Sequence, residues 1–525
     1  MPDQPGYPGV YVEEVPGGVR GIASVPTSVA AFVGRAWRGP VDQAISVGSY
    51  REFERIFGGL WAPAPMSRAV RQFFNNGGGV ARVVRVATRV GAGQASPARI
   101  ELGNGLALAA ADPGTWGRNL VAVLTPQPGD PQDPTRFSLE VHDDPDRHRD
   151  ASGQGGSGIR ELHTGLSLDP GHARHCGAVL ARDSMLVRLL HAPDSLSLPD
   201  AAPQLLASAD PTSGHDGLPI GAGEVSDVAN EAAGTGLYAL GEGAGFNLLC
   251  IPPFAPEITN NGIATWRAAA ALCRSRRALL LIDAPADATV GEAIAFTLSL
   301  APIEAEWAAV YHPWLWTDDP SAGHGETPAA PGGFVAGLLA RVDAQRGVWK
   351  APAGLEAGLR GARGLALAQR PGGPTEDDLA SLNAAGICAL RTLPGRSEVV
   401  AWGARTLAGA ADSGSEWKYI PVRRTAAMIE TALVRGTTWT VFEANDERLW
   451  AQLRLSVGSY LHSLFLAGAF AGSTAREAYF VRCGADTHAA RDIAQGRVNL
   501  QIGVALVRPA EFVMLRPELR AIADP

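Results

Sequence analysis

Short apolar runs that end in turn residues recur in two parts of the chain. Near its start, residues 27–33 (TSVAAFV) and 81–86 (ARVVRV) each have the length and composition of a buried strand. In the middle, between about residues 237 and 406, the runs are FNLLCIPPF, ALLLIDAP and AAVYHPWLW, and the helix-like TWRAAAALCRSRR separates the first two. Strands that alternate with helices in this way predict a parallel sheet covered by helices.

Capping residues mark where two helices begin or end. Ser49 and Glu52 have the spacing of a capping box, and Gly58-Gly59 is predicted to end that helix. Near the other end of the chain, Asn445 is a favourable N-cap for a long helix. The buried face of that helix is predicted from apolar residues at helical spacing: Leu449, Leu453, Val457, Leu461 and Leu464. Two strand-like runs follow, RVNLQIGVALV and EFVML.

Residues 91–234 have a different character. Polar and turn-forming residues dominate there, as in DDPDRHRDASGQGGSG at residues 143–158, and the apolar runs are short and separated. We predict strands and loops exposed at the surface, in a region that tolerates sequence change.

The first twenty residues contain a strand-like run between turn residues. Residues 10–15 (VYVEEV) follow Pro8-Gly9 and precede Pro16-Gly17-Gly18. A six-residue strand spans about 20 Å, and these flanks would let it swing away from the body of the protein. Two interpretations remain open. The segment either folds onto its own domain or is an arm that pairs with a sheet edge of another subunit.

Composition narrows the possible functions. The 525 residues are too many for one core and suggest roughly three or four domains. A formal net charge of −8 argues against a general nucleic-acid or membrane-surface binder. The five cysteines are scattered and form no CxxC pair, so we expect neither a disulfide framework nor a cysteine zinc site. The sequence begins without the pattern of a signal peptide, and no apolar stretch approaches the ~18 residues that span a bilayer. We therefore expect assembly in the cytoplasm.

The common catalytic and phosphate-binding motifs are missing from the sequence. It contains no GxxxxGK[ST], no HExxH and no GxSxG. His172, His175 and Cys176 are close enough in sequence to share a metal ion. They lie in a predicted surface loop without a paired ligand motif, so a solvated loop is the favoured interpretation. No metal and no cofactor is expected.

One pair of residues has the order of a protease motif. Asp283 follows a buried strand and His324 lies between two glycines, as do the Asp and His of subtilisin-like proteases. The serine motif GTSxAxP is missing downstream, and Glu326 and prolines occupy the place where a helix should begin. Catalysis is therefore not expected. Asp283 is predicted to cap a helix or turn at the end of its strand, and His324 to sit in a loop.

Successive segments of the chain resemble the tail sheath proteins of contractile phages and related injection systems. In the N-terminal part these segments are PGVYVEEV, TSVAAFVGRAWRGP, EFERIFGG and QFFNNGGGVARVVRV. The middle contributes YHPWLW, FVAGLLARVDAQRGVWKAPAG, LNAAGICALRTLPGR and WGARTL. The end contributes WKYIPVRRTAAMIE, WTVFEANDERLW, GAFAGSTAREAYFVRCG and PAEFVML. Together they cover about half of the chain, and their order makes the resemblance specific.

The resemblance implies a structural protein with no active site. In that family, six-subunit rings stack into a helical tube around an inner tube, and terminal arms complete a β-sheet in neighbouring subunits. The matching arm residues here are Val10, Tyr11, Val12, Glu13, Glu14 and Val15 at one end and Phe512, Val513, Met514 and Leu515 at the other. By the same analogy, a helix near residues 486–495 would contact the tube through Asp486, Arg491, Asp492 and Gln495, unless it packs in its own core. Trp417, Arg423 and Arg424 match the family pattern and serve either folding or neighbour contacts.

The fold implied by the resemblance is an α/β and α+β multidomain protein. It has a central subtilisin-like α/β domain without a catalytic triad, a mixed α+β C-terminal domain, a β-rich outer insertion and extended N- and C-terminal arms. The predicted divisions are residues 1–20 (N-terminal arm), 21–90 (α/β segment packing with the core), 91–234 (outer domain), 235–412 (middle domain) and 413–525 (C-terminal domain with a terminal β arm).

The resemblance also implies partners. These are further copies of the chain, an inner tube protein, and baseplate and tail terminator or cap proteins, with no nucleic acid and no membrane insertion. The particle would be a phage tail or a contractile injection particle. Two other classes are kept as alternatives, a subtilisin-like hydrolase and a surface adhesin residing in residues 91–234.

Overall fold

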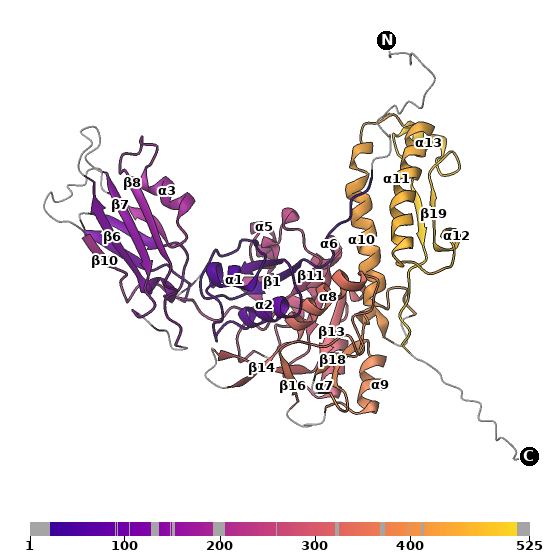
Figure 1. Cartoon of the computed structure of the whole chain (residues 1–525), viewed down its shortest axis with the longest axis horizontal. Helices are drawn as coiled ribbons and strands as arrows, with labels where there is room; N and C mark the ends of the chain where they lie inside the picture. The colour runs from indigo at the N-terminus through magenta and orange to yellow at the C-terminus, as the bar shows by residue number, and fades with distance from the viewer. Residues whose placement is uncertain are drawn as a thin grey trace, which may run out of the picture. The chain divides into compact units, whose positions relative to one another are not determined.

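The computed structural model describes residues 21–511 with short gaps. The gaps are residues 90, 92, 104, 128–135, 148, 150–152, 193–204, 259, 321–324, 368–372, 397 and 411–413. The chain forms two compact units. We call residues 27–423 the main unit, and residues 1–26 together with 424–525 the C-terminal unit (Figure 1).

The main unit is built on an eight-stranded sheet. In sheet order its strands are β18 (Val399–Ala401), β17 (Ile387–Thr392), β13 (Ala308–His312), β12 (Leu279–Asp283), β11 (Leu248–Cys250), β1 (Ala30–Gly34), β3 (Ala81–Arg85) and β2 (Ile45–Val47). The six inner strands are parallel, and the two edge strands pair antiparallel. Inner strands such as β1 and β12 are buried at every residue, which suits short apolar runs in a sheet covered on both faces.

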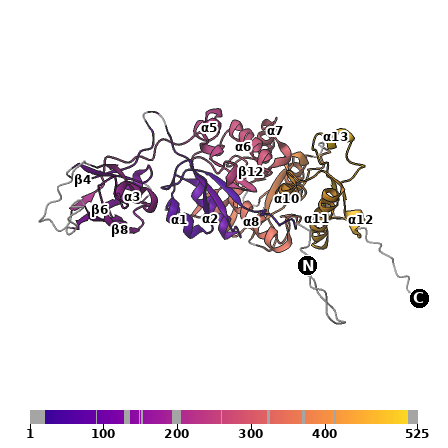
Figure 2. The same cartoon turned by 90° about the horizontal axis from the view of Figure 1, so that it is seen from above.

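Helices cover both faces of this sheet. Figure 2 shows α1 (Tyr50–Phe57), α2 (Pro65–Asn75) and α8 (Gly332–Arg346) on one side, and α6 (Ile263–Arg276) and α7 (Val290–Ser299) on the other. The remaining helices of the main unit are α3 (Cys176–Asp183), α4 (Ala222–Ser226), α5 (Val228–Ala233) and α9 (Glu376–Ala384). A small sheet of β15 (Glu326–Ala329), β14 (Trp314–Asp318) and β16 (Ala362–Ala366) completes this part.

The helix limits predicted for α1 are confirmed. The Ser49 hydroxyl accepts a hydrogen bond from the Glu52 backbone N–H at 3.2 Å, and the Glu52 carboxylate accepts one from the Gly48 N–H at 2.8 Å. Gly58 ends the helix in the left-handed conformation, with φ of +86°. Glycine adopts this conformation at the least cost, which explains its place here.

Two glycines of α8 let that helix pack very closely on α2. Gly333 and Gly337 are one helical turn apart and both fully buried. A Cβ atom added at Gly333 would lie 2.4 Å from the Ala69 carbonyl oxygen, and one at Gly337 would lie 2.4 Å from the Phe73 carbonyl oxygen. Side chains larger than hydrogen at these two positions would therefore push the helices apart.

Residues 99–208 contain the strands of the β-rich segment. One sheet has the order β10 (Leu205–Ser208), β6 (Leu120–Pro126), β7 (Phe137–Asp143) and β8 (Arg160–Leu166), and a second has the order β4 (Arg99–Gly103), β5 (Leu106–Ala110) and β9 (Val187–His191). Both contribute to one apolar core that includes Trp37, Trp116 and Phe137. The β-strands predicted for this region are thus present, together with the helix α3.

A buried ion pair joins the β-rich segment to the region next to β1. The Arg38 guanidinium lies 3.0 Å from the Asp143 carboxylate, and their side chains are 5% and 0% exposed. Ser157 donates its hydroxyl hydrogen to the same carboxylate, and Arg38 also binds the Arg55 carbonyl oxygen at 2.8 Å. These bonds compensate the cost of taking both charges out of water.

The C-terminal unit contains two long helices and a two-stranded sheet. Its elements are α10 (Ile420–Gly436), which begins in the main unit, α11 (Glu447–Leu466), α12 (Ala475–Ala478), β19 (Tyr479–Arg482), α13 (Ala490–Ala494) and β20 (Gln501–Val504). Within the described part of the chain, no helix combines the length and the hydropathy needed to cross a membrane.

The predicted N-cap of α11 is wrong by one residue. Asp446 is the N-cap, and its carboxylate accepts the Leu449 backbone N–H at 3.0 Å. Asn445 instead accepts the Trp450 indole N–H and donates to the Arg497 carbonyl oxygen. The negative charge of a carboxylate at a helix N-terminus is stabilised by the helix dipole. The Asn445 amide can both donate and accept a hydrogen bond, and it uses both to link two other segments.

Candidate assembly surface

The sheet of the C-terminal unit is short and has two open edges. β19 and β20 pair antiparallel over four residues each, and among the described residues no further strand pairs with either of them. α11 contacts β19, and the Tyr479 ring lies 6.4 Å from the His462 ring of that helix. An isolated two-stranded sheet is marginal in stability, and its unpaired main-chain groups are a template for an added strand.

The two predicted arms lie outside the described residues. These are residues 10–15 and 512–515. The chain next to the first arm lies in the C-terminal unit, where the Ile22 side chain adjoins Gly436 at the end of α10. The last described residue, Glu511, belongs to the same unit.

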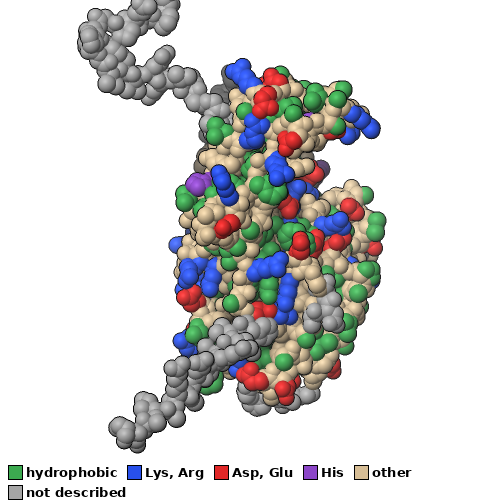
Figure 3. Space-filling model, turned by 90° about the vertical axis from the view of Figure 1, so that its right-hand side faces the viewer, with side chains coloured by type: hydrophobic (Ala, Val, Ile, Leu, Met, Phe, Trp, Pro, Cys, Tyr) green, Lys and Arg blue, Asp and Glu red, His purple; other side chains and the backbone are tan. Residues whose placement is uncertain are grey.

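The helix predicted near residues 486–495 is present as α13. Three of the four residues proposed for it, Asp486, Arg491 and Gln495, are exposed. Asp492 has a structural task, because its carboxylate accepts the Ala489 backbone N–H at 3.3 Å and the Asn499 side-chain amide at 3.1 Å. Figure 3 draws the side of the molecule that lies at the right of Figure 1, where basic and acidic side chains are interspersed among hydrophobic ones.

One buried histidine closes the segment that carries α13. The His488 Nε2 atom accepts the Asn499 backbone N–H at 2.7 Å, and Nδ1 lies 2.7 Å from the Gly484 carbonyl oxygen, so Nδ1 carries the hydrogen. The imidazole is stacked on the Trp450 ring of α11, with ring centroids 4.4 Å apart. Residues 484 and 499 are thereby tied together and anchored on α11.

Of the two residues that suggested a protease, the structure describes Asp283, which is bonded to the start of a helix. Asp283 is only 6% exposed, and its carboxylate accepts the Gly332 backbone N–H at the start of α8 at 2.7 Å. This confirms the prediction that Asp283 caps a helix. His324 lies outside the described residues. Burial raises the pKa of Asp283 to about 7, and the bond from Gly332 offsets part of this rise.

One of the three possible metal ligands has other surroundings than predicted. Cys176 begins α3 and is buried, so the prediction of a solvated loop is wrong for this residue. Burial raises the pKa of its thiol to about 11, which disfavours the thiolate that a metal would need. The His172 ring nitrogen Nδ1 accepts the Arg174 backbone N–H at 3.1 Å. In the described part of the chain, no three His, Cys, Asp or Glu side chains form a group that could hold a metal ion.

Arg423 has a role in folding. Its guanidinium lies between two indole rings, 4.1 Å from the centroid of Trp307 and 3.9 Å from that of Trp417. Arg423 is 4% exposed, so these cation–π contacts are shielded from water and fix the first turn of α10. Arg424, the next residue, is also buried.

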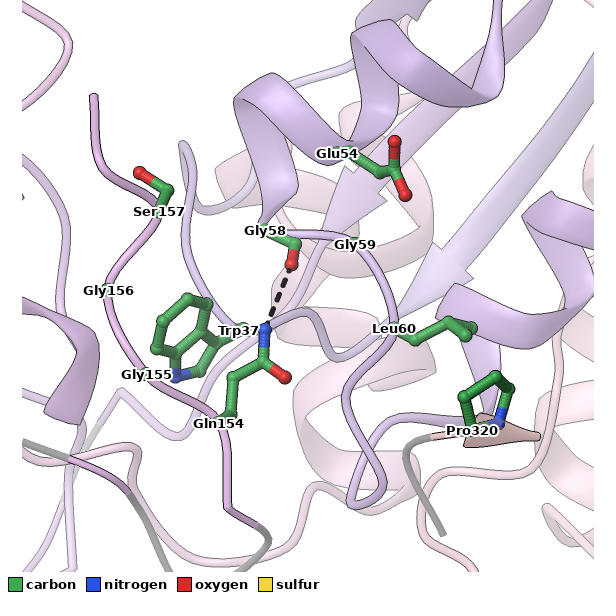
Figure 4. Close-up of a pocket in the computed structure, with 10 residues that line it drawn as sticks. All are labelled: Trp37, Glu54, Gly58, Gly59, Leu60, Gln154, Gly155, Gly156, Ser157 and Pro320. Carbon is green, nitrogen blue, oxygen red and sulfur yellow. Dashed lines mark hydrogen bonds between the residues drawn. The ribbon is translucent and has the colours of Figure 1, made fainter. Parts of the chain in front are cut away.

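A cavity of about 420 Å³ lies between the end of α1 and the loop that follows β7 (Figure 4). Its lining residues are Trp37, Glu54, Gly58, Gly59, Leu60, Gln154, Gly155, Gly156, Ser157 and Pro320. Glu54 is the one charged residue among them. Gln154 crosses the cavity to donate a hydrogen bond to the Gly58 carbonyl oxygen at 3.4 Å. Among these described lining residues, Glu54 has no second titratable side chain with which to form an acid–base pair.

The strand β19 is the part of this surface that the residue pattern missed. The apolar pattern predicted the run that contains β20, and the family resemblance suggested a helix near α13, but neither identified residues 479–482 as a strand. The signal was present in the β-favouring sequence Tyr-Phe-Val, which follows directly on the short helix α12.

Comparisons with known proteins agree with one another. Residues 412–520 match the family model described as phage tail sheath C-terminal domain. Over 304 residues the chain is 26% identical to the "Putative prophage major tail sheath protein" of Pseudomonas aeruginosa (strain UCBPP-PA14), which covers 56% of this chain and 72% of that protein.

Solved sheath structures share the mixed α and β fold over nearly the whole chain. The contracted sheath of PVC, an extracellular contractile injection system, matches with a TM-score of 0.55 and 21% identity, covering 98% of both chains. The contracted helical sheath of the anti-feeding prophage matches with a TM-score of 0.55 and 23% identity, covering 97% of this chain and 98% of that one. The resemblance to contractile tail sheath proteins that the sequence predicted is confirmed.

Proposed function

We propose that this chain is the structural subunit of a contractile sheath. Copies of it polymerise as stacked hexameric rings around an inner tube, and contraction of the sheath drives that tube into a target envelope. The observation that carries this proposal is the sheet β19–β20, which has open edges and lies in the region that matches the sheath C-terminal domain. Every copy in an assembly held by exchanged strands needs such an edge.

In this proposal the terminal arms supply the exchanged strands. Residues 10–15 and 512–515 adjoin the described ends of the C-terminal unit, which also holds the acceptor sheet. Because each copy carries both the donated strand and the acceptor sheet, the contact between two copies is head-to-tail. Repetition of a head-to-tail contact builds a filament when the copies do not close into a ring. The prolines and glycines beside the first arm act as hinges, so copies stay linked while the rigid bodies change between two packings.

Removal of residues 1–20 is expected to abolish assembly. The measurement is negative-stain electron microscopy of the full chain and of the truncated chain, each expressed alone. Long hollow tubes from the full chain that disappear on truncation support both the sheath and the arm. Tubes from both contradict the role of the arm. Absence of filaments from the full chain, even with the tube and baseplate proteins present, contradicts the sheath itself.

Val481→Pro is expected to block assembly without unfolding the C-terminal unit. The Ala505 N–H donates to the Ala478 carbonyl oxygen, and alternation along the antiparallel ladder then directs the Val481 N–H to the outer edge of β19. Proline at this position removes a donor that an added strand would use and leaves the bonds to β20 in place. The check is loss of tubes in micrographs with an unchanged circular dichroism spectrum. Val481→Thr keeps the N–H and should form tubes, whereas tubes from the proline variant would exclude pairing at this edge.

The proposed partners follow from the same assembly. They are other copies of this chain, the inner tube protein, and the baseplate and terminator or cap proteins. Asp486, Arg491 and Gln495 are proposed to contact the tube, since all three are exposed on one short segment that His488 fixes to α11. Asp492 is proposed to hold that segment in shape. We propose assembly in the cytoplasm and a place in a phage tail or a contractile injection particle.

We further propose that the chain has no enzymatic activity and that its middle domain is subtilisin-like in fold only. Asp283 is enclosed and engaged with α8, which leaves it unable to orient a histidine at a substrate. A serine-directed fluorophosphonate probe should leave the protein unlabelled, and labelling would favour the hydrolase alternative. The division into segments 21–90, 91–234, 235–412 and 413–525 remains our proposal, as does the outward position of the second of these.

A further inference from the structure

The loop between α10 and α11 presents a phenylalanine entirely to solvent. Phe442 is fully exposed, and the neighbouring Val441 is 60% exposed. Phe442 also has a φ of +72°, a left-handed conformation that bulky residues rarely adopt. Folding of this chain alone therefore gains nothing from the aromatic ring and bears the cost of its backbone conformation.

The loop is nevertheless held in a defined shape. The Val441 N–H donates to the Thr438 carbonyl oxygen at 3.3 Å, and the Glu443 N–H donates to that of Thr440 at 3.1 Å. Trp439 packs against the apolar cluster of Leu449, Trp450, Leu453 and Cys483. The exposed ring is thus displayed on a rigid support, which reduces the entropy lost when a partner binds it.

This loop adjoins the segment that carries α13. The Asn445 side-chain amide donates to the Arg497 carbonyl oxygen at 3.0 Å, and Val498 and Leu500 pack on the same cluster as Trp439. On α13 itself, Ile493 is 40% exposed. One end of the C-terminal unit therefore combines exposed apolar side chains with the exposed polar residues Asp486, Arg491 and Gln495. Apolar anchors with a polar surround are the usual arrangement of an energetic hot spot.

We propose that Phe442, with Val441 beside it, is an apolar anchor that inserts into a pocket on the inner tube protein. This inference rests on the proposed function, because the continuity of the loop with the α13 segment is what selects the tube as the partner. Contacts between copies of this chain are assigned instead to main-chain strand pairing at β19–β20. The tube surface that fits would offer an apolar pocket with charged groups around it.

The test compares Phe442→Asn with Leu466→Asn. Asparagine tolerates the left-handed conformation, so the first variant removes the ring and keeps the loop. Leu466 is also exposed, at 73%, but lies at the far end of α11, about 30 Å along the helix. The full-length proteins are mixed with the tube protein of the same contractile system, and tube-filled sheaths are measured by cosedimentation and negative stain. Thermal unfolding of both variants should match that of the unchanged chain.

Phe442→Asn is expected to weaken association with the tube at least tenfold, and Leu466→Asn to change it less than twofold. Association of Phe442→Asn equal to that of the unchanged chain overturns the inference and leaves the sheath proposal intact. If Phe442→Asn also abolishes the empty tubes that the chain forms alone, the ring contacts a second copy of this chain and not the tube protein. That result would likewise overturn the inference. If the unchanged chain neither forms tubes nor binds the tube protein, the proposed function fails and the inference with it.

Discussion

Gly337→Ala is expected to lower the free energy of unfolding of the main unit by about 3 kcal/mol. The added methyl group would lie 2.4 Å from the Phe73 carbonyl oxygen and 2.5 Å from the Cβ atom of Asn76. Neither atom can move alone, because the first is helix backbone and the Asn76 side chain is itself bonded to the backbone N–H and carbonyl oxygen of Arg360. The two helices must separate, and the apolar side chains between them lose contact. Urea unfolding at pH 7 measures the effect through the transition midpoint.

A second glycine of the same unit provides the matched control. Gly291 lies in α7, and a Cβ atom added there would meet no other atom within 4 Å. Gly291→Ala is therefore expected to leave stability unchanged or to raise it by up to about 1 kcal/mol, since alanine restricts the unfolded chain and favours helix. Equal midpoints for the two variants would mean that α8 and α2 can separate at no cost, and would contradict the close packing.

The sequence predicted the local elements of the sheet but not their neighbours. β1 and β12 were recognisable because an apolar run that is buried on both faces leaves a clear pattern. The pairing of β1 with β11 joins residues about 218 positions apart, and no local pattern encodes such a contact. The same limit applies to Asp283, whose capping role was predicted from its place after a strand, while its partner Gly332 lies 49 residues further on.

The candidate assembly surface was also only partly predictable from the sequence. A helix near residues 486–495 was predicted, yet the separation of Asp492 from the three exposed polar residues required knowledge of the hydrogen bonds to Ala489 and Asn499. Phe442 gave no signal, because its segment WTVFEAND contains apolar residues that in most proteins would be buried. Exposure of such a residue depends on how the flanking helices end, and that is settled only in three dimensions.

Asp283→Asn is expected to stabilise the main unit at alkaline pH. Burial raises the pKa of the folded-state carboxyl from an ordinary value near 3.8 to about 7. The folded protein therefore binds this proton more tightly than the unfolded chain, and stability falls as the pH rises from about 4 to about 7. The full loss is about 4 kcal/mol. Asparagine carries no charge and retains an oxygen that can accept the Gly332 N–H, so the variant escapes this loss.

The decisive quantity is the change of the stability difference with pH. Any fixed cost of the amide, including an unsatisfied N–H, is the same at every pH, and all other titrating groups are shared and cancel. The free energy of unfolding of the variant, minus that of the unchanged chain, should therefore increase by about 4 kcal/mol between pH 4 and pH 8, as measured by urea unfolding.

Asp319→Asn is the contrasting control, because Asp319 is a buried carboxylate 3.0 Å from the Arg68 guanidinium. Its removal leaves that guanidinium uncompensated and should destabilise the unit by about 3–5 kcal/mol near neutral pH. A stability difference for Asp283→Asn that stays constant across the range would mean that the carboxylate is solvated or paired in the folded protein, and that its resemblance to a catalytic aspartate has to be considered again.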